Sequence, residues 1–135
     1  MDASASATHA IPHTPKAVYW AGWVITVLPA VALVMSAVMK FMRPTEVVEG
    51  FIHLGWPDQL ALALGIVELT CTILYVIPGT AMLGAILLTG YLGGAIATHV
   101  RIEEGFVAPI IIGLLIWLGI YLREPRLREI LPFRS

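Results

Sequence analysis

Four long apolar runs follow one another along the chain, separated by segments that are polar or contain Pro and Gly. A helix that crosses a hydrocarbon core about 30 Å thick needs roughly 17–25 apolar residues at about 1.5 Å each, and each run fits this range. The runs are continuous and do not alternate between apolar and polar positions, so they favour helices over strands. The pattern predicts four membrane-spanning helices, at residues 17–39, 59–77, 80–98 and 106–122.

The segment between the first two runs has a different pattern. Residues 44–54 begin with Pro-Thr, which suits a helix start, and Val47 and Phe51 lie one helical turn apart. We expect a short amphipathic helix that lies in the membrane interface, although an ordinary loop is the alternative. Pro78 and Gly79 predict a tight turn, which makes the second and third spans an antiparallel hairpin.

Composition supports the membrane assignment. The chain is 59% hydrophobic and only 13% charged, whereas soluble domains carry about 45–50% apolar and about 25% charged residues. With 135 residues it is expected to form one domain. We predict an all-α integral membrane protein, a four-transmembrane-helix bundle at residues 17–128 with a short interfacial helix between helices one and two. A flexible polar tail at residues 1–16 and a C-terminal tail at residues 129–135 complete the predicted organisation.

Several functional classes have no support in the sequence. The net charge is −1 and no basic tract interleaves with aromatic residues, so nucleic-acid binding is not expected. Cys71 is the single cysteine, which excludes an intramolecular disulfide, a Cys-x-x-Cys thiol exchanger and a thiolate zinc site. A metal site from His53, His99 and a carboxylate lacks the spacing of a recognised zinc motif, and no metal is expected.

The lysines and arginines predict an orientation. Four spans place both termini on one side, and that side carries more of the positive residues. The chain is therefore expected to be a multi-pass protein of the cell membrane with both termini in the cytoplasm. The residues on the terminal side are Lys16, Arg123, Arg126, Arg128 and Arg134, against Lys40, Arg43 and Arg101 on the other side.

Glu68 is the most informative residue, because it lies in the middle of the second apolar run with no Lys or Arg on that run. An ionisable group near the bilayer midplane is costly unless it is partnered or neutral, and such groups are functional candidates. Glu68 could carry a proton, or it could bind a small polar ligand such as a quinone head. It could also be a clasp that hydrogen-bonds a neighbouring helix, with Thr70, Thr89, Tyr91 and Thr98 as candidate donors.

The other non-terminal charges gather on the side opposite the termini. Lys40 ends the first span there and His99 ends the third, and Lys40 can reach inward to pair with Glu68 or His99. We predict a buried polar pocket, for a ligand or a proton, that opens to this outer side and is lined by Lys40, Glu68 and His99. Candidates for a second layer around it are His53, Glu49 and Arg101.

Small residues run through the third span. Gly90 and Gly94 form a Gly-x-x-x-Gly pattern, which allows two helices in a membrane to approach closely. The pattern predicts that this span is the central packed helix of the bundle, with a dimer interface as the alternative.

Several short motifs, taken together in their order and spacing, resemble the DoxX-like family of small four-helix membrane proteins. They are SAVMKF at residues 36–41, LGWP at 54–57, LGIVEL at 64–69, GGAIATH at 93–99 and LREPRL at 122–127. Lys40, Glu68 and His99 match polar positions of the family. The similarity extends from about Trp20 to Leu127.

The resemblance implies a fold and a general role. The founding DoxX type is a subunit of a thiosulfate:quinone oxidoreductase, and other relatives are linked to redox-stress assemblies or act as chaperones of membrane complexes. We therefore expect an accessory subunit of a membrane complex, without catalytic activity of its own and with quinone as the one candidate cofactor. Its expected partners are the lipid bilayer and a membrane protein or a second copy. The alternatives are a small proton-coupled transporter and a membrane chaperone or structural protein.

Overall fold

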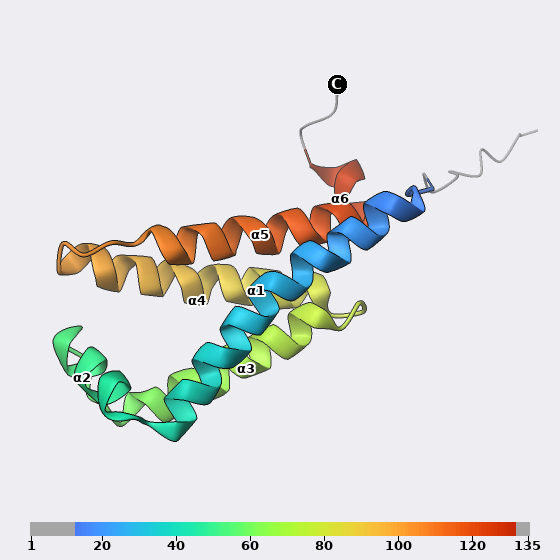
Figure 1. The fold of residues 1–135 in the computed structure, drawn as a ribbon. Helices are drawn as coiled ribbons and strands as arrows, with labels where there is room; N and C mark the ends of the chain where they lie inside the picture. The colour runs from blue at the N-terminus through green and yellow to red at the C-terminus, as the bar shows by residue number, and fades with distance from the viewer. Residues whose placement is uncertain (1–12, 132–135) are drawn as a thin grey trace, which may run out of the picture.

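The computed structural model describes residues 13–131, and this part of the chain contains only helices and the loops that join them (Figure 1). Two of the helices are short, α2 and α6, and the other four are long and apolar. In chain order the elements are α1 (Lys16–Met42), α2 (Thr45–His53), α3 (Leu60–Val76), α4 (Ala81–Arg101), α5 (Val107–Arg123) and α6 (Pro125–Ile130).

The four long helices form a ring. α1 packs against α3 and α5, and α4 packs against the same two helices, so α1 and α4 face each other across the bundle. Figure 1 shows that α1 and α3 diverge from α4 and α5 toward the end of the bundle where α2 lies. We call this the α2 end, and the opposite end, where α6 follows α5, the α6 end.

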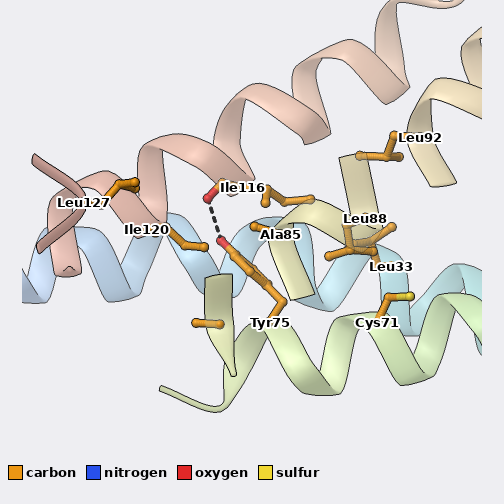
Figure 2. Close-up of a cluster of buried hydrophobic side chains, with 10 residues drawn as sticks. Leu33, Cys71, Tyr75, Ala85, Leu88, Leu92, Ile116, Ile120 and Leu127 are labelled. Carbon is orange, nitrogen blue, oxygen red and sulfur yellow. Dashed lines mark hydrogen bonds between the residues drawn. The ribbon is translucent and has the colours of Figure 1, made fainter. Parts of the chain in front are cut away.

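The tightest packing lies on the α6 side of this divergence. Tyr75 of α3 is fully buried, and its hydroxyl donates a hydrogen bond of 3.1 Å to the Ile116 carbonyl of α5 (Figure 2). A Cβ at Gly84 of α4 would lie only 2.2 Å from the Tyr75 backbone nitrogen, so α3 and α4 touch there through their backbones. The surrounding core includes Leu33, Cys71, Ala85, Leu88, Leu92 and Ile120.

The outer surface of the long helices is apolar. α1 and α4 are each long and apolar enough to cross a membrane, and α3 and α5 are shorter apolar helices of 17 residues. Apolar surface exposed on this scale marks contact with lipid or with another protein. The chain is an α-helical membrane protein. Exposed side chains include Val24, Leu28 and Met35 on α1, Leu62 and Ile66 on α3, Leu83 and Ile86 on α4, and Ile111 and Leu114 on α5.

The predicted runs agree closely with the helices. Each apolar run corresponds to one long helix, and the segment at 44–54 is helical as α2, while its position in a membrane interface stays a prediction. Most of the predicted tail at 1–16 lies outside the described residues. The predicted C-terminal tail begins too early, because α6 continues to Ile130. Pro125 suits the first turn of α6, and the Glu124 side chain caps it by accepting a hydrogen bond from the Arg126 backbone N–H.

The prediction that Gly90 and Gly94 bring helices together within the chain is wrong. A Cβ at either position would have no neighbour within 4 Å among the described residues, and both glycines are exposed. The close approach of α4 uses Gly84, six residues before Gly90, because that face of the helix meets α3. The dimer alternative for the Gly-x-x-x-Gly pattern stays a prediction.

Candidate functional site

Glu68 is paired with a lysine of another helix. It lies on α3 with 2% of its surface exposed, and its Oε2 is 2.7 Å from Nζ of Lys40, in the last turn of α1. Lys40 also donates a hydrogen bond of 2.6 Å to Oγ of Ser36, one turn earlier on the same face of α1. The pair therefore joins α1 to α3 at a buried position.

The threonines considered as donors to Glu68 have other partners. Thr70, Thr89 and Thr98 each donate to a carbonyl four residues earlier in their own helices. Lys40 is thus the partner that compensates the charge of Glu68, which makes burial of the carboxylate tolerable. An ammonium has three N–H donors, and Ser36 and Glu68 take two of them, so one is left for another acceptor.

A large cavity opens beside this ion pair. It has a volume of about 720 Å³ and is lined by residues of α1, α2, α3, α4 and α5, so it occupies the α2 end of the bundle, where the helix pairs diverge. Most of its lining is apolar, which is typical of sites for small organic molecules with a few polar groups for orientation. Its polar lining residues are Ser36, Lys40, Glu68, Tyr91, Thr98 and His99.

His99 lies in the same cavity but does not join the ion pair. Its Nδ1 is 2.8 Å from the Ala95 carbonyl oxygen, one turn earlier on α4. Because a carbonyl only accepts, Nδ1 must carry the proton, and in the neutral ring Nε2 is then an acceptor. The structure thus brings Lys40 and Glu68 into contact and places His99 on the α4 wall of their cavity. That these three residues serve a ligand or a proton stays a prediction.

The three residues suggested as a second layer do not line the cavity. Glu49 is exposed on α2. His53, at the end of α2, pairs with Glu104 in the α4–α5 loop, and Arg101 donates a hydrogen bond to the Leu54 carbonyl. The His53–Glu104 contact therefore fastens α2 to the α4–α5 loop, and Arg101 fastens the end of α2 to the end of α4. Val47 and Phe51 of α2 line the cavity.

Sequence reasoning missed several residues of the cavity. Ser36 had a usable signal, because it lies four residues before Lys40 on one helix face. Tyr91 was considered only as a partner for Glu68, and Phe51 only as part of the α2 pattern. Within residues 13–131, no group of three or more His, Cys, Asp or Glu side chains is placed to hold a metal ion.

Comparison with known proteins identifies a family. The model of the DoxX-like family matches residues 24–119, a range that contains Lys40, Glu68 and His99 and reaches from the first helix into α5. Neither the curated proteins nor the solved structures give a match.

Proposed function

The chain belongs to the DoxX-like family, and from that premise we propose that it is a four-span membrane protein whose cavity at the α2 end binds a lipid-soluble ligand with a polar head. In this proposal the chain acts as an accessory subunit of a membrane complex. The observation that carries it is the Lys40–Glu68 ion pair, which stands in the wall of a largely apolar cavity.

The exposed faces of α3 and α5 support four spans. Their 17 residues give about 25 Å of helix, at the lower limit for a hydrocarbon core. Both expose bulky apolar side chains, such as Ile66 at 52% and Leu114 at 66%, which water disfavours and lipid does not. With four spans, both termini lie in the cytoplasm and the α2 end faces outward, as the lysine and arginine bias favours.

This topology has a direct test. In a Cys71→Ala background, His13→Cys marks the terminal side and Glu46→Cys, at an exposed position of α2, marks the α2 end. We expect a membrane-impermeant maleimide to label the second variant and not the first in intact cells. Labelling of both, or of the first alone, contradicts the topology.

The cavity chemistry favours a carbonyl-bearing head with an apolar tail, such as a quinone. The spare N–H of Lys40 supplies a donor for a carbonyl oxygen, and Nε2 of a neutral His99 ring supplies an acceptor from α4 for a hydroxyl of the head, as in a reduced quinone. The apolar lining, including Leu33, Leu64 and Ile112, suits a ring and its tail. A volume of about 720 Å³ lies within the range of about 300–1,000 Å³ for such sites.

The accessory role rests on the chain's own chemistry. Its single cysteine leaves it without a dithiol to exchange electrons, so a redox reaction at the cavity needs a partner that supplies them. Purification from its native membrane in a mild detergent tests this role. We expect a second membrane protein to co-purify in fixed ratio, and recovery of this chain alone contradicts the subunit role.

A structural role is the second candidate, because the same ion pair ties α1 to α3. If the pair is only a clasp, a variant that restores stability also restores function. Lys40→Met/Glu68→Gln removes both charges without leaving one unpaired in the interior. Ligand binding lost in this variant, with melting close to that of the wild type, favours the ligand site over the clasp.

A further inference from the structure

A second buried charge lies at the α6 end, far from the Lys40–Glu68 pair. Arg123, the last residue of α5, is only 7% exposed. Its guanidinium lies 4.6 Å from the centre of the Trp23 ring and 5.1 Å from that of Tyr75. Nη2 donates a hydrogen bond of 2.6 Å to the Tyr75 carbonyl, and Nη1 lies 3.5 Å from the Val76 carbonyl. Arg123 thus supplies hydrogen-bond donors and a positive charge to the free carbonyl groups in the last turn of α3.

This guanidinium has no anionic partner within residues 13–131. The ion pairs in that range are Lys40–Glu68, Arg43–Asp58 and His53–Glu104. Its Nε is buried and has no hydrogen-bond partner among the described residues. A buried charge is costly unless it is paired, and aromatic rings and two carbonyls compensate an arginine only in part. No carboxylate of the described residues therefore neutralises Arg123 in an ion pair.

A cavity of about 310 Å³ adjoins Arg123. It lies between the start of α1, the α3–α4 turn, the end of α5 and α6. Arg126, which is exposed and in no ion pair of the described chain, also lines it. One carboxylate lines the cavity as well: Glu124, which caps the start of α6 by accepting from the Arg126 backbone N–H at 3.4 Å.

The N-terminus of α4 adds a second attraction for an anion. Ala81 and Met82, the first residues of this 21-residue helix, line the cavity. The preceding Thr80 makes no side-chain capping hydrogen bond to the helix, and its hydroxyl donates to the Leu74 carbonyl at 2.8 Å. The first N–H groups of a helix lack intrahelical acceptors and carry its positive end, so an uncapped start favours an anion.

We propose that this cavity binds the phosphate of an anionic phospholipid headgroup. Arginine matches phosphate oxygens better than any other side chain, and Arg126 supplies the guanidinium that a ligand can reach. Arg123 and the start of α4 supply buried positive potential.

The position of the cavity favours a lipid over a soluble phosphate. Tyr19 and Trp23 line it, and these ring types are typical of the headgroup level of a membrane. Ile130, also in the lining, is 80% exposed, which suits contact with acyl chains. Basic pockets between helices on the cytoplasmic side of a membrane recognise anionic lipid headgroups in this way.

The test measures lipid binding to the purified full chain in a neutral detergent. Phosphatidylglycerol and phosphatidylcholine of equal chain length are titrated, and bound lipid is counted by native mass spectrometry. We expect the wild type to bind phosphatidylglycerol at least about tenfold more tightly. Arg126→Gln should weaken that binding about tenfold, which is about 1.4 kcal/mol. Lys16→Gln is the matched control, because Lys16 is an exposed cation near the same end that does not line the cavity.

The outcomes separate the site from a general attraction of charge. Binding within about twofold of the wild type in Lys16→Gln supports the site, whereas equal losses in Lys16→Gln and Arg126→Gln overturn it. Equal affinity of the wild type for both lipids overturns it as well. Displacement of phosphatidylglycerol by millimolar inorganic phosphate overturns the lipid as ligand and points to a soluble phosphate. This binding does not involve the Lys40–Glu68 pair, which does not line the cavity beside Arg123, so failure here is independent of the cavity at the α2 end.

Discussion

Lys40 and Glu68 are 28 positions apart in the chain, yet Nζ and Oε2 lie 2.7 Å from each other in the wall of the cavity at the α2 end. Glu68 is almost fully buried, while 15% of the Lys40 side chain is exposed. The carboxylate therefore holds the ammonium at the boundary of the cavity. One N–H of that ammonium is left for a ligand, because Ser36 and Glu68 occupy the other two.

The first prediction concerns the coupling of this pair. Glu68→Gln leaves Lys40 without a counter-charge, and removing one partner of a buried pair costs about 3–5 kcal/mol. Lys40→Met/Glu68→Gln removes both charges, so its unfolding free energy should lie closer to that of the wild type. Thermal melting of Lys40→Met, Glu68→Gln and the double variant in detergent measures this. Additive losses would mean that the two residues do not interact.

Much of the fold followed from hydropathy. The runs predicted the bounds of the four long helices to within a few residues. The reason is that a long apolar stretch between polar breaks can cross a membrane in few conformations other than a helix. The same topology put Lys40 on the correct side to reach Glu68. The hydropathy of a run does not say which face of a helix meets a neighbour, and for this reason Gly90 and Gly84 could not be told apart.

Other features need tertiary information. The divergence of α1 and α3 from α4 and α5 creates the cavity, and no local pattern encodes such an angle. From the sequence, Arg123 served only to predict the orientation in the membrane. Its aromatic partner Trp23 could not be found in this way, because it lies on a helix 100 positions earlier in the sequence. The contacts of His53 and Arg101 likewise depend on the α4–α5 loop and the end of α4, which the sequence did not place beside α2.

The second prediction uses two glycines of α4. Gly84→Ala places a Cβ 2.2 Å from the Tyr75 backbone nitrogen, and backbone atoms cannot yield as a flexible side chain can. We expect a loss of about 3 kcal/mol or more, at the upper end of overpacking effects. Gly90→Ala is the matched control, because its Cβ meets nothing within 4 Å, and it should change stability by about 1 kcal/mol at most. Equal melting temperatures for the two variants would contradict the packing of α3 on α4.

The third prediction concerns Tyr75. Tyr75→Phe removes the buried hydrogen bond to the Ile116 carbonyl and keeps the ring in the core (Figure 2). The expected loss is about 0.5–1.5 kcal/mol. Tyr19→Phe, at an exposed tyrosine of α1, should have no measurable effect on melting. A loss as large for Tyr19→Phe as for Tyr75→Phe would exclude this bond as the cause.

The fourth prediction concerns the attachment of α2 over the cavity. Glu104→Gln weakens its contact with His53, which is an ion pair only when the imidazole is protonated, and exposed ion pairs are worth at most about 1 kcal/mol. Amide hydrogen exchange in α2 should therefore become about two- to fivefold faster, without change in α1 or α5. Glu103→Gln is the control, since Glu103 is exposed and in no ion pair of the described residues. The same acceleration in both variants would contradict the role of the His53–Glu104 contact.

Binding of a short-chain ubiquinone to the protein in lipid nanodiscs tests the central claim most directly. We expect saturable binding by the wild type and an affinity at least about tenfold lower for Lys40→Met/Glu68→Gln, since that variant lacks the ammonium donor. Arg43→Gln, which breaks the exposed pair with Asp58 outside the cavity, should bind as the wild type does. Equal affinity of the wild type and the double variant, or no saturable binding by the wild type, would contradict a quinone-type ligand at the Lys40–Glu68 pair.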